Sequence, residues 1–210
     1  MQMNELTKEI GKWSHRNFGD QVSRTMSVAL GSTAPVMGLS EEYGELLLAI
    51  AEKNSVDIED AISDIGIYAC DMTSRELGFG NGRHEKIEGK SFEDPIAGIG
   101  HAIGQINHCF LKRHQGIRGF SDRTVFREKA TAALQSLWYY LDLAAHKHAG
   151  KSIEELVEET FTDIVADRDW ASNPENAADV SDGPVTIDDD LTGMVGANIV
   201  DDQPDHDETE

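Results

Sequence analysis

The sequence predicts an all-α protein that ends in an acidic tail, and three observations lead to this prediction. Apolar side chains recur at helical spacing through residues 1–174. Glycine and proline interrupt this pattern at intervals typical of helix ends. After Arg168 there is no lysine or arginine, and residues 175–210 contain 12 acidic side chains with little apolar periodicity. We therefore expect a helical body and a disordered acidic tail.

Each expected helix has its own start and stop signals. In chain order the helices are expected to span Leu6–Phe18, Ser40–Asn54, Asp57–Leu77, Pro95–Gln115, Arg123–Ala149 and Ser152–Trp170. Ser40 and Asp57 are expected N-caps, because their short polar side chains can accept from free backbone N–H groups. This start would place Glu41 and Glu42 in a first turn, where the helix dipole favours acids.

The charge distribution limits the classes of partner. The formal net charge is -21, and removing the 12 negative charges of residues 175–210 leaves about -9 on residues 1–174. Such a surface repels nucleic-acid polymers and anionic membranes, so neither is an expected partner. No apolar run approaches the roughly 18 residues of a membrane span, and no signal peptide is visible. With only Cys70 and Cys109, a cytoplasmic location fits best.

Similarity between two parts of the sequence suggests a tandem repeat within the helical body. Residues 38–46 (GLSEEYGEL) align with residues 98–106 at an offset of 60, and residues 64–71 align with residues 135–142 at an offset of 71. The apolar and glycine positions match, but the acids are replaced. Glu41, Glu42, Glu45 and Asp64 become His101, Ala102, Gln105 and Gln135. We expect a catalytic half at 1–90, a degenerate second half at 91–174 and the tail at 175–210.

Carboxylates are the chemically informative feature of the first half. Glu42 and Glu45 are three residues apart, and Asp60 and Asp64 are four apart, so each pair shares a helix face. If the two helices pack antiparallel, these acids converge on one place. Oxygen ligands of this kind suit Mg²⁺, with Mn²⁺ as an alternative. The competing interpretation is that Glu41, Glu42 and Glu45 are solvated acids of an ordinary first turn.

The motif resembles a known family. Residues 38–46, followed by the acidic helix that contains residues 64–68 (DIGIY), are similar to the MazG-like all-α nucleoside triphosphate pyrophosphohydrolases. Residues 164–170 (IVADRDW), with Asn173 and Pro174, resemble the closing helix of phage-type members. That family's signature is Glu-Glu-x-x-Glu followed by Glu-x-x-Asp, and Glu42, Glu45 and Asp64 match it. One position departs, because Ala61 stands where the family has glutamate, and the neighbouring Asp60 is the candidate substitute.

The resemblance implies a fold, a reaction and site residues. The fold would be a MazG-like helical bundle, completed by a dimer partner or, in a pseudo-dimeric monomer, by the second repeat. The reaction would be Mg²⁺-dependent hydrolysis of a (deoxy)nucleoside triphosphate to the monophosphate and pyrophosphate, in bacterial or phage-infected cytoplasm. The expected metal ligands are Glu42, Glu45, Asp60 and Asp64, the expected catalytic residues are Glu41 and Glu45, and the expected substrate contacts are Lys12, Arg16, Tyr68 and Arg168.

A second hypothesis belongs to a different functional class. The absent glutamate at Ala61 and the loss of acids in the second repeat are also typical of a catalytically weakened member. Such a protein would bind a nucleotide or a protein partner and act as a regulator, with the acidic tail as an interaction segment.

Overall fold

The structure is a computed structural model that describes residues 1–19, 33–77, 92–117 and 119–168. Every regular element in these ranges is helical, so the expected all-α class is confirmed there. The elements are α1 (Met3–Ser14), the π-helical turn η1 (His15–Gly19), α4 (Thr33–Glu52), α5 (Ser55–Met72), the π-helical turn η2 (Thr73–Leu77), α6 (Pro95–His114), α7 (Arg123–His148) and α8 (Ile153–Arg168). All of them belong to one unit that spans Met1–Asp179.

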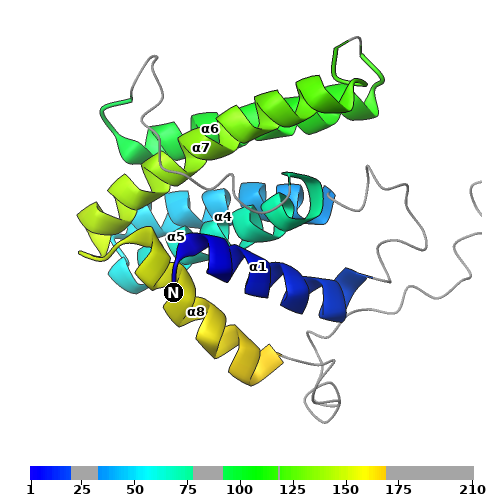
Figure 1. The fold of residues 1–210 in the computed structure, drawn as a ribbon. Coiled ribbons are helices and arrows are strands. Elements are labelled where there is room, and N and C mark those ends of the chain that lie inside the picture. The colour runs from blue at the N-terminus through cyan, green and yellow to red at the C-terminus, as the bar shows by residue number, and fades with distance from the viewer. Residues whose placement is uncertain (20–32, 78–91, 118, 169–210) are drawn as a thin grey trace, which may run out of the picture. The chain divides into compact units, whose positions relative to one another are not determined.

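Helix α5 is the central element of this unit. It packs against α1, α4, α7 and α8, whereas α6 packs against α4 and α7 (Figure 1). Two helical hairpins are therefore stacked, one made of α4 and α5 and the other of α6 and α7. The long α6–α7 hairpin lies across the first hairpin, and α1 and α8 cover the remaining sides of α5 (Figure 1).

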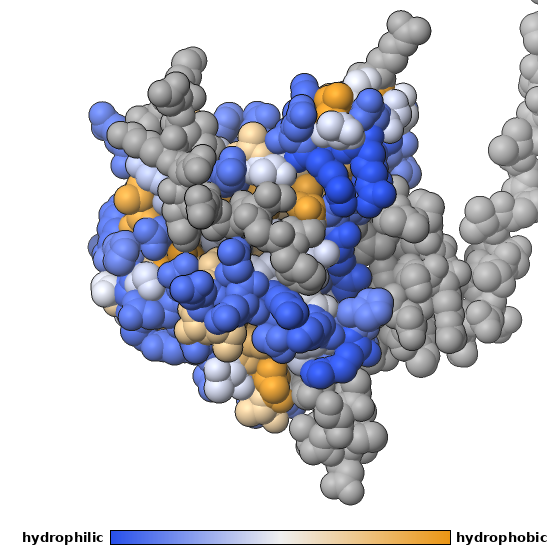
Figure 2. All heavy atoms as spheres, viewed as in Figure 1, coloured by the Kyte–Doolittle hydropathy of each residue, from blue (hydrophilic) through white to orange (hydrophobic). Residues whose placement is uncertain are grey.

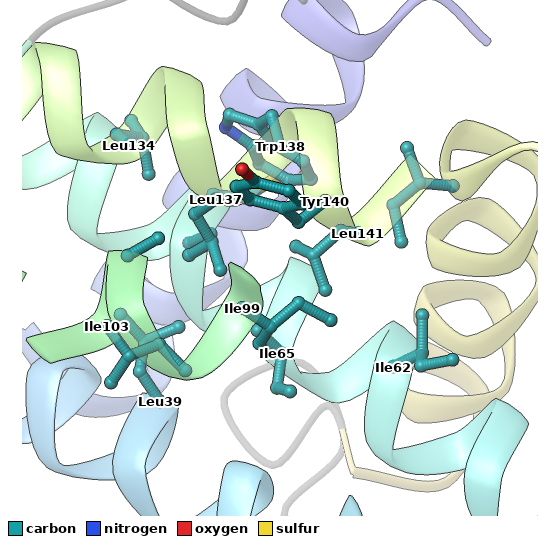
Figure 3. Close-up of a cluster of buried hydrophobic side chains, with 14 of the residues drawn as sticks. Leu39, Ile62, Ile65, Ile99, Ile103, Leu134, Leu137, Trp138, Tyr140 and Leu141 are labelled. Atoms are coloured by element: carbon teal, nitrogen blue, oxygen red, sulfur yellow. The ribbon is translucent and has the colours of Figure 1, made fainter. Parts of the chain in front are cut away.

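The hydrophobic core fills the space between the two hairpins. Ile62 and Ile65 of α5 are fully buried, and Ile65 lies close to Ile99 of α6 (Figure 3). The other side chains labelled in this cluster are Leu39 of α4, Ile103 of α6, and Leu134, Leu137, Trp138, Tyr140 and Leu141 of α7. Burying a side chain of this size contributes about 1.5–3 kcal/mol. The apolar periodicity of the sequence thus becomes one continuous core rather than two.

The prediction that Ser40 begins a helix is wrong, because α4 begins seven residues earlier at Thr33. Pro35 lies in the first turn, where a missing backbone N–H costs nothing. Ser40 lies inside the helix, and its hydroxyl donates to the carbonyl of Val36 at 3.3 Å. The same hydroxyl accepts from Asn107 of α6 at 3.0 Å. Glu41 and Glu42 are therefore mid-helix residues and not first-turn acids.

The N-cap of the next helix also differs from the prediction. Asn54, not Asp57, caps α5, and its side-chain oxygen accepts from the backbone N–H groups of Val56 and Asp57. The other expected helix boundaries agree with the structure to within about three residues when the π-helical turns η1 and η2 are counted as continuations of α1 and α5. The expected disordered tail, and Asn173 and Pro174 beyond the closing helix, lie outside the described residues.

The described surface is mainly polar. The face seen in Figure 2 is mostly hydrophilic, with hydrophobic residues in small groups. Within the described ranges, no helix is both long enough and apolar enough to cross a membrane. Cys70 and Cys109 are free and buried, in agreement with an ordinary core role for both thiols.

Candidate metal centre

The α4–α5 hairpin holds the candidate site, and its register is fixed by Gly38 and Tyr68. A Cβ atom added to Gly38 would lie only 2.5 Å from ring carbons of Tyr68, so the ring packs directly on the glycine backbone. Because the two helices run antiparallel, one turn forward on α4 meets one turn back on α5. That step brings Glu42 opposite Asp64. The next step brings Glu45 to the level of Ala61, with Asp60 beside it.

Glu42 is the most unusual acid of this set. Its residue is only 9% exposed, yet no hydrogen bond or ion pair to it is formed within the described parts of the chain. Its pKa is raised to about 8, first because burial disfavours the charged carboxylate. The second cause is the negative charge of Asp64. Smaller contributions come from Glu45, Glu41 and Asp60.

The other four acids of the sequence prediction thus all lie within electrostatic range of Glu42. Asp64 is half-buried, whereas Glu41, Glu45 and Asp60 are exposed at the edge of the hairpin. Among the described residues, no three or more His, Cys, Asp or Glu side chains stand in position to hold a metal ion. The acids therefore form an open group around one buried carboxylate, and the exposed members would have to turn inward to share a cation.

Tyr68 lies beside the acids without stacking space on the Gly38 side. The ring is half-buried, with Gly38 against it. The pKa of its hydroxyl is raised, mainly by burial and then by the charge of Glu42. The expected contact of Tyr68 with the substrate is therefore restricted to the part of the ring that stays exposed.

Ala61 occupies the position at which the resembled family carries a glutamate. Its side chain is 3% exposed and packs in the core. Asp60 is one position round the helix and is exposed, so it approaches the acids from the solvent side. The charge of Asp60 therefore contributes to the raised pKa of Glu42, but Asp60 does not occupy the position of the glutamate that Ala61 replaces.

The expected phosphate contacts differ in their surroundings. Lys12 donates to Glu9 at 2.7 Å on the exposed face of α1. Arg16 lies in the exposed η1 turn. The side chain of Arg168 lies outside the described residues.

The second hairpin repeats the glycine–tyrosine contact without the acids. A Cβ atom on Gly98 would lie 2.3 Å from the ring of Tyr140, and Ala102, one turn on, is fully buried. Tyr140 is 72 residues after Tyr68, so aligning the two hairpins by this contact gives an offset of 72, against the expected 71. In that alignment Asp64 falls on Ser136 rather than Gln135. An offset of 71 would instead pair buried core positions of α5 with the exposed Lys129 and Ala132 of α7.

A polar network at the end of α5 was not anticipated from the sequence. Asp71 is buried, and the Nε of Arg75 donates to its carboxylate at 2.8 Å. The same guanidinium donates to the hydroxyl of Ser14 in α1 at 2.8 Å. The i, i+4 spacing of Asp71 and Arg75 was the available signal. The network fixes α1 against the end of α5, next to the candidate site.

Comparison of the chain with protein-family models, with curated proteins and with solved structures finds no match. The support for a function therefore comes from the geometry of the acids alone.

Proposed function

We propose that the chain is a Mg²⁺-dependent nucleoside triphosphate pyrophosphohydrolase, which converts a (deoxy)nucleoside triphosphate to the monophosphate and pyrophosphate. The observation that carries the proposal is Glu42, a buried carboxylate with no partner in the described chain and with Asp64 opposite it. A buried acid in this state costs stability unless a cation or a proton compensates it. Binding of a metal ion by Glu42 would compensate this loss of stability and would explain why a buried acid occurs at this position.

The residues present fit a hard divalent cation. All the candidate ligands are carboxylates, which are the ligands that Mg²⁺ and Mn²⁺ prefer. Glu42 and Asp64 would hold the ion on the buried side, and Glu45 and Asp60 would close over it from solvent. Once bound, such a cation neutralises the phosphates and stabilises charge on the leaving pyrophosphate. It would also let an anionic substrate approach a chain of net charge -21.

The remaining chemistry is assigned to the exposed glutamates. Glu41 and Glu45 lie at the solvent edge of the hairpin, where a carboxylate can accept a proton from the attacking water and orient it. Arg16, Lys12 and Arg168 stay candidate contacts for the phosphates. The side of the site that binds the substrate would then face solvent, and Glu42 would hold the cation on the buried side.

The finer fold assignment, a MazG-like bundle of two tandem repeats, is part of the same proposal. Its support is the match of buried positions between the hairpins at offsets of 60 and 72. The matched buried pairs are Pro35 and Pro95, Val36 and Ile96, Leu39 and Ile99, Glu42 and Ala102, Leu46 and Ile106, Ile62 and Leu134, and Ile65 and Leu137. The second hairpin would complete the bundle in cis in a pseudo-dimeric monomer, with a homodimer as the alternative. Two buried free thiols fit a bacterial or phage-infected cytoplasm.

Release of pyrophosphate tests the proposal directly. The full chain is incubated with each common nucleoside and deoxynucleoside triphosphate and Mg²⁺, and pyrophosphate and monophosphate are quantified. We expect turnover that Glu42→Gln or Asp64→Asn reduces by at least about 100-fold, as removal of a group that acts on transition-state charge does. Glu52→Gln, an exposed acid farther along α4, is the matched control and should keep wild-type turnover. Turnover that survives both site substitutions would refute the site.

A regulator is the second candidate function, and the buried Ala61 favours it. With a core methyl group where the resembled family has a ligand, the metal would be held by fewer carboxylates. The protein would then bind a nucleotide or a protein partner without hydrolysis. Mg²⁺-dependent nucleotide binding in equilibrium dialysis, with no pyrophosphate released, would support this function over the hydrolase.

A further inference from the structure

The two hairpins of the chain carry the same tyrosine in two different hydrogen-bonding states. Tyr140 packs on Gly98, and its hydroxyl oxygen accepts from the backbone N–H of Phe92 at 3.0 Å. Tyr68 packs on Gly38 in the same way, but its hydroxyl makes no hydrogen bond within the described residues. Both tyrosine rings therefore pack on a glycine, but of the two hydroxyls only that of Tyr140 makes a hydrogen bond within the described residues.

The surroundings of the two hydroxyls differ in charge. Tyr68 lies one turn along α5 from Asp64, and Glu42 lies one turn along α4 from Gly38. The acids whose charge acts on the Tyr68 hydroxyl are, in decreasing order, Glu42, Glu41, Asp64 and Asp71. In the second hairpin the positions equivalent to Glu42 and Asp64 are Ala102 and Ser136, which carry no charge. Tyr68, whose hydroxyl makes no hydrogen bond within the described residues, therefore belongs to the hairpin that carries the acids.

We infer that Tyr68 is a positioning residue of the metal centre, whose hydroxyl donates a hydrogen bond to a carboxylate of the Glu42–Asp64 pair and so fixes its orientation toward the cation. A protonated phenol can donate one hydrogen bond, and a ligating carboxylate has lone pairs left over after it binds a metal. Such outer hydrogen bonds orient the ligands in metal sites generally. The inference rests on the proposed metal centre and adds a residue to it.

The packing on Gly38 explains why this phenol can act as a fixed donor. The ring has no freedom to move toward α4, because the glycine backbone already lies against its edge carbons. The contact restrains the ring on its α4 side, so the hydroxyl has a restricted range of positions, and a carboxylate of the pair would turn toward it on binding the cation. This role differs from base stacking, which would use the ring face and not the hydroxyl.

The test compares Tyr68→Phe with Tyr140→Phe in the full-length chain. Both substitutions remove one hydroxyl and keep the ring that packs on the glycine. Mn²⁺ is the probe, with bound and free ion separated by electron paramagnetic resonance, and the melting temperature is measured in the presence of a chelator. We expect Tyr68→Phe to weaken Mn²⁺ binding by roughly 10–100-fold with an unchanged melting temperature. We expect Tyr140→Phe to lower the melting temperature and to leave the Mn²⁺ affinity unchanged.

The outcomes separate this inference from the proposed function. If Tyr68→Phe binds Mn²⁺ as tightly as the wild type while Glu42→Gln does not bind it, the positioning role is refuted and the metal centre stands. If the wild type binds no Mn²⁺ at millimolar concentration, both are refuted. If Tyr68→Phe and Tyr140→Phe lower metal affinity and melting temperature together, the effect is general destabilisation, and the positioning role is again refuted.

Discussion

Glu42 of α4 lies opposite Asp64 of α5, one helical turn beyond the point at which the ring of Tyr68 closes on Gly38. This relationship places a buried acid next to a half-buried one at the centre of the first hairpin. Like charges at this separation cannot both be ionised without cost. Glu42 therefore holds a proton at neutral pH, which the proposed cation would displace, and the first two predictions follow from this relationship.

The first prediction concerns the stability of the metal-free protein as a function of pH. The pKa of Glu42 is raised to about 8 in the folded state from an ordinary 4.5, so the folded state binds the extra proton between these values. The free energy of unfolding should therefore fall as the pH rises through this window. Melting temperatures in a chelator should drop by a few degrees between about pH 6 and about pH 9. Glu42→Gln, which is neutral throughout, should show a smaller drop.

Glu128→Gln serves as the control for that pH series, because Glu128 is an exposed acid on α7. It should follow the wild-type curve. An identical pH dependence in the wild type and in Glu42→Gln would contradict the raised pKa.

The second prediction is that metal binding releases a proton. At about pH 7 the metal-free Glu42 is protonated, whereas a carboxylate must lose its proton to bind the ion. Titration calorimetry with Mn²⁺ in buffers of different ionisation enthalpy should show release of up to about one proton per site at this pH. The number should fall toward zero above about pH 9, where Glu42 is already ionised. A binding enthalpy that does not depend on the buffer would exclude this linkage.

The third prediction uses the two glycine–tyrosine contacts as a matched pair. Gly38→Ala and Gly98→Ala each place a methyl group where ring carbons of a tyrosine already lie, at 2.5 Å and 2.3 Å. Each should destabilise the fold by about 1–3 kcal/mol, as overpacking does, measured by urea denaturation. Only Gly38→Ala should also weaken Mn²⁺ binding, because only its tyrosine adjoins the acids. An equal loss of affinity in both variants would show that the first hairpin has no special role.

The fourth prediction concerns the network that holds α1 against α5. Arg75→Ala leaves the buried Asp71 carboxylate without its guanidinium partner, so it should cost about 3 kcal/mol in urea denaturation. Lys12→Ala breaks an ion pair whose side chains are 53% and 48% exposed, and it should change stability by less than about 1 kcal/mol. Similar losses in the two variants would mean that the Asp71 site is more hydrated than its burial indicates.

Several features of the chain were determined by the sequence alone. The all-α class follows from apolar spacing that recurs through residues 1–174, because that spacing leaves each segment one face to bury. The convergence of Glu42 and Asp64 follows from acids placed at helical intervals on consecutive segments, because a short connection between helices makes them pack antiparallel. Local periodicity is sufficient for both conclusions.

Other features were decided only by tertiary packing. The start of α4 at Thr33 rather than Ser40 goes with tertiary burial of the added residues, since Val36 and Leu39 both lie in the core. A cap signal is local, and such contacts between distant segments override it. The burial of Glu42 and the core position of Ala61 have the same origin. Each depends on which face of a helix packs against its neighbour, and this face is determined only by the packing of the whole core.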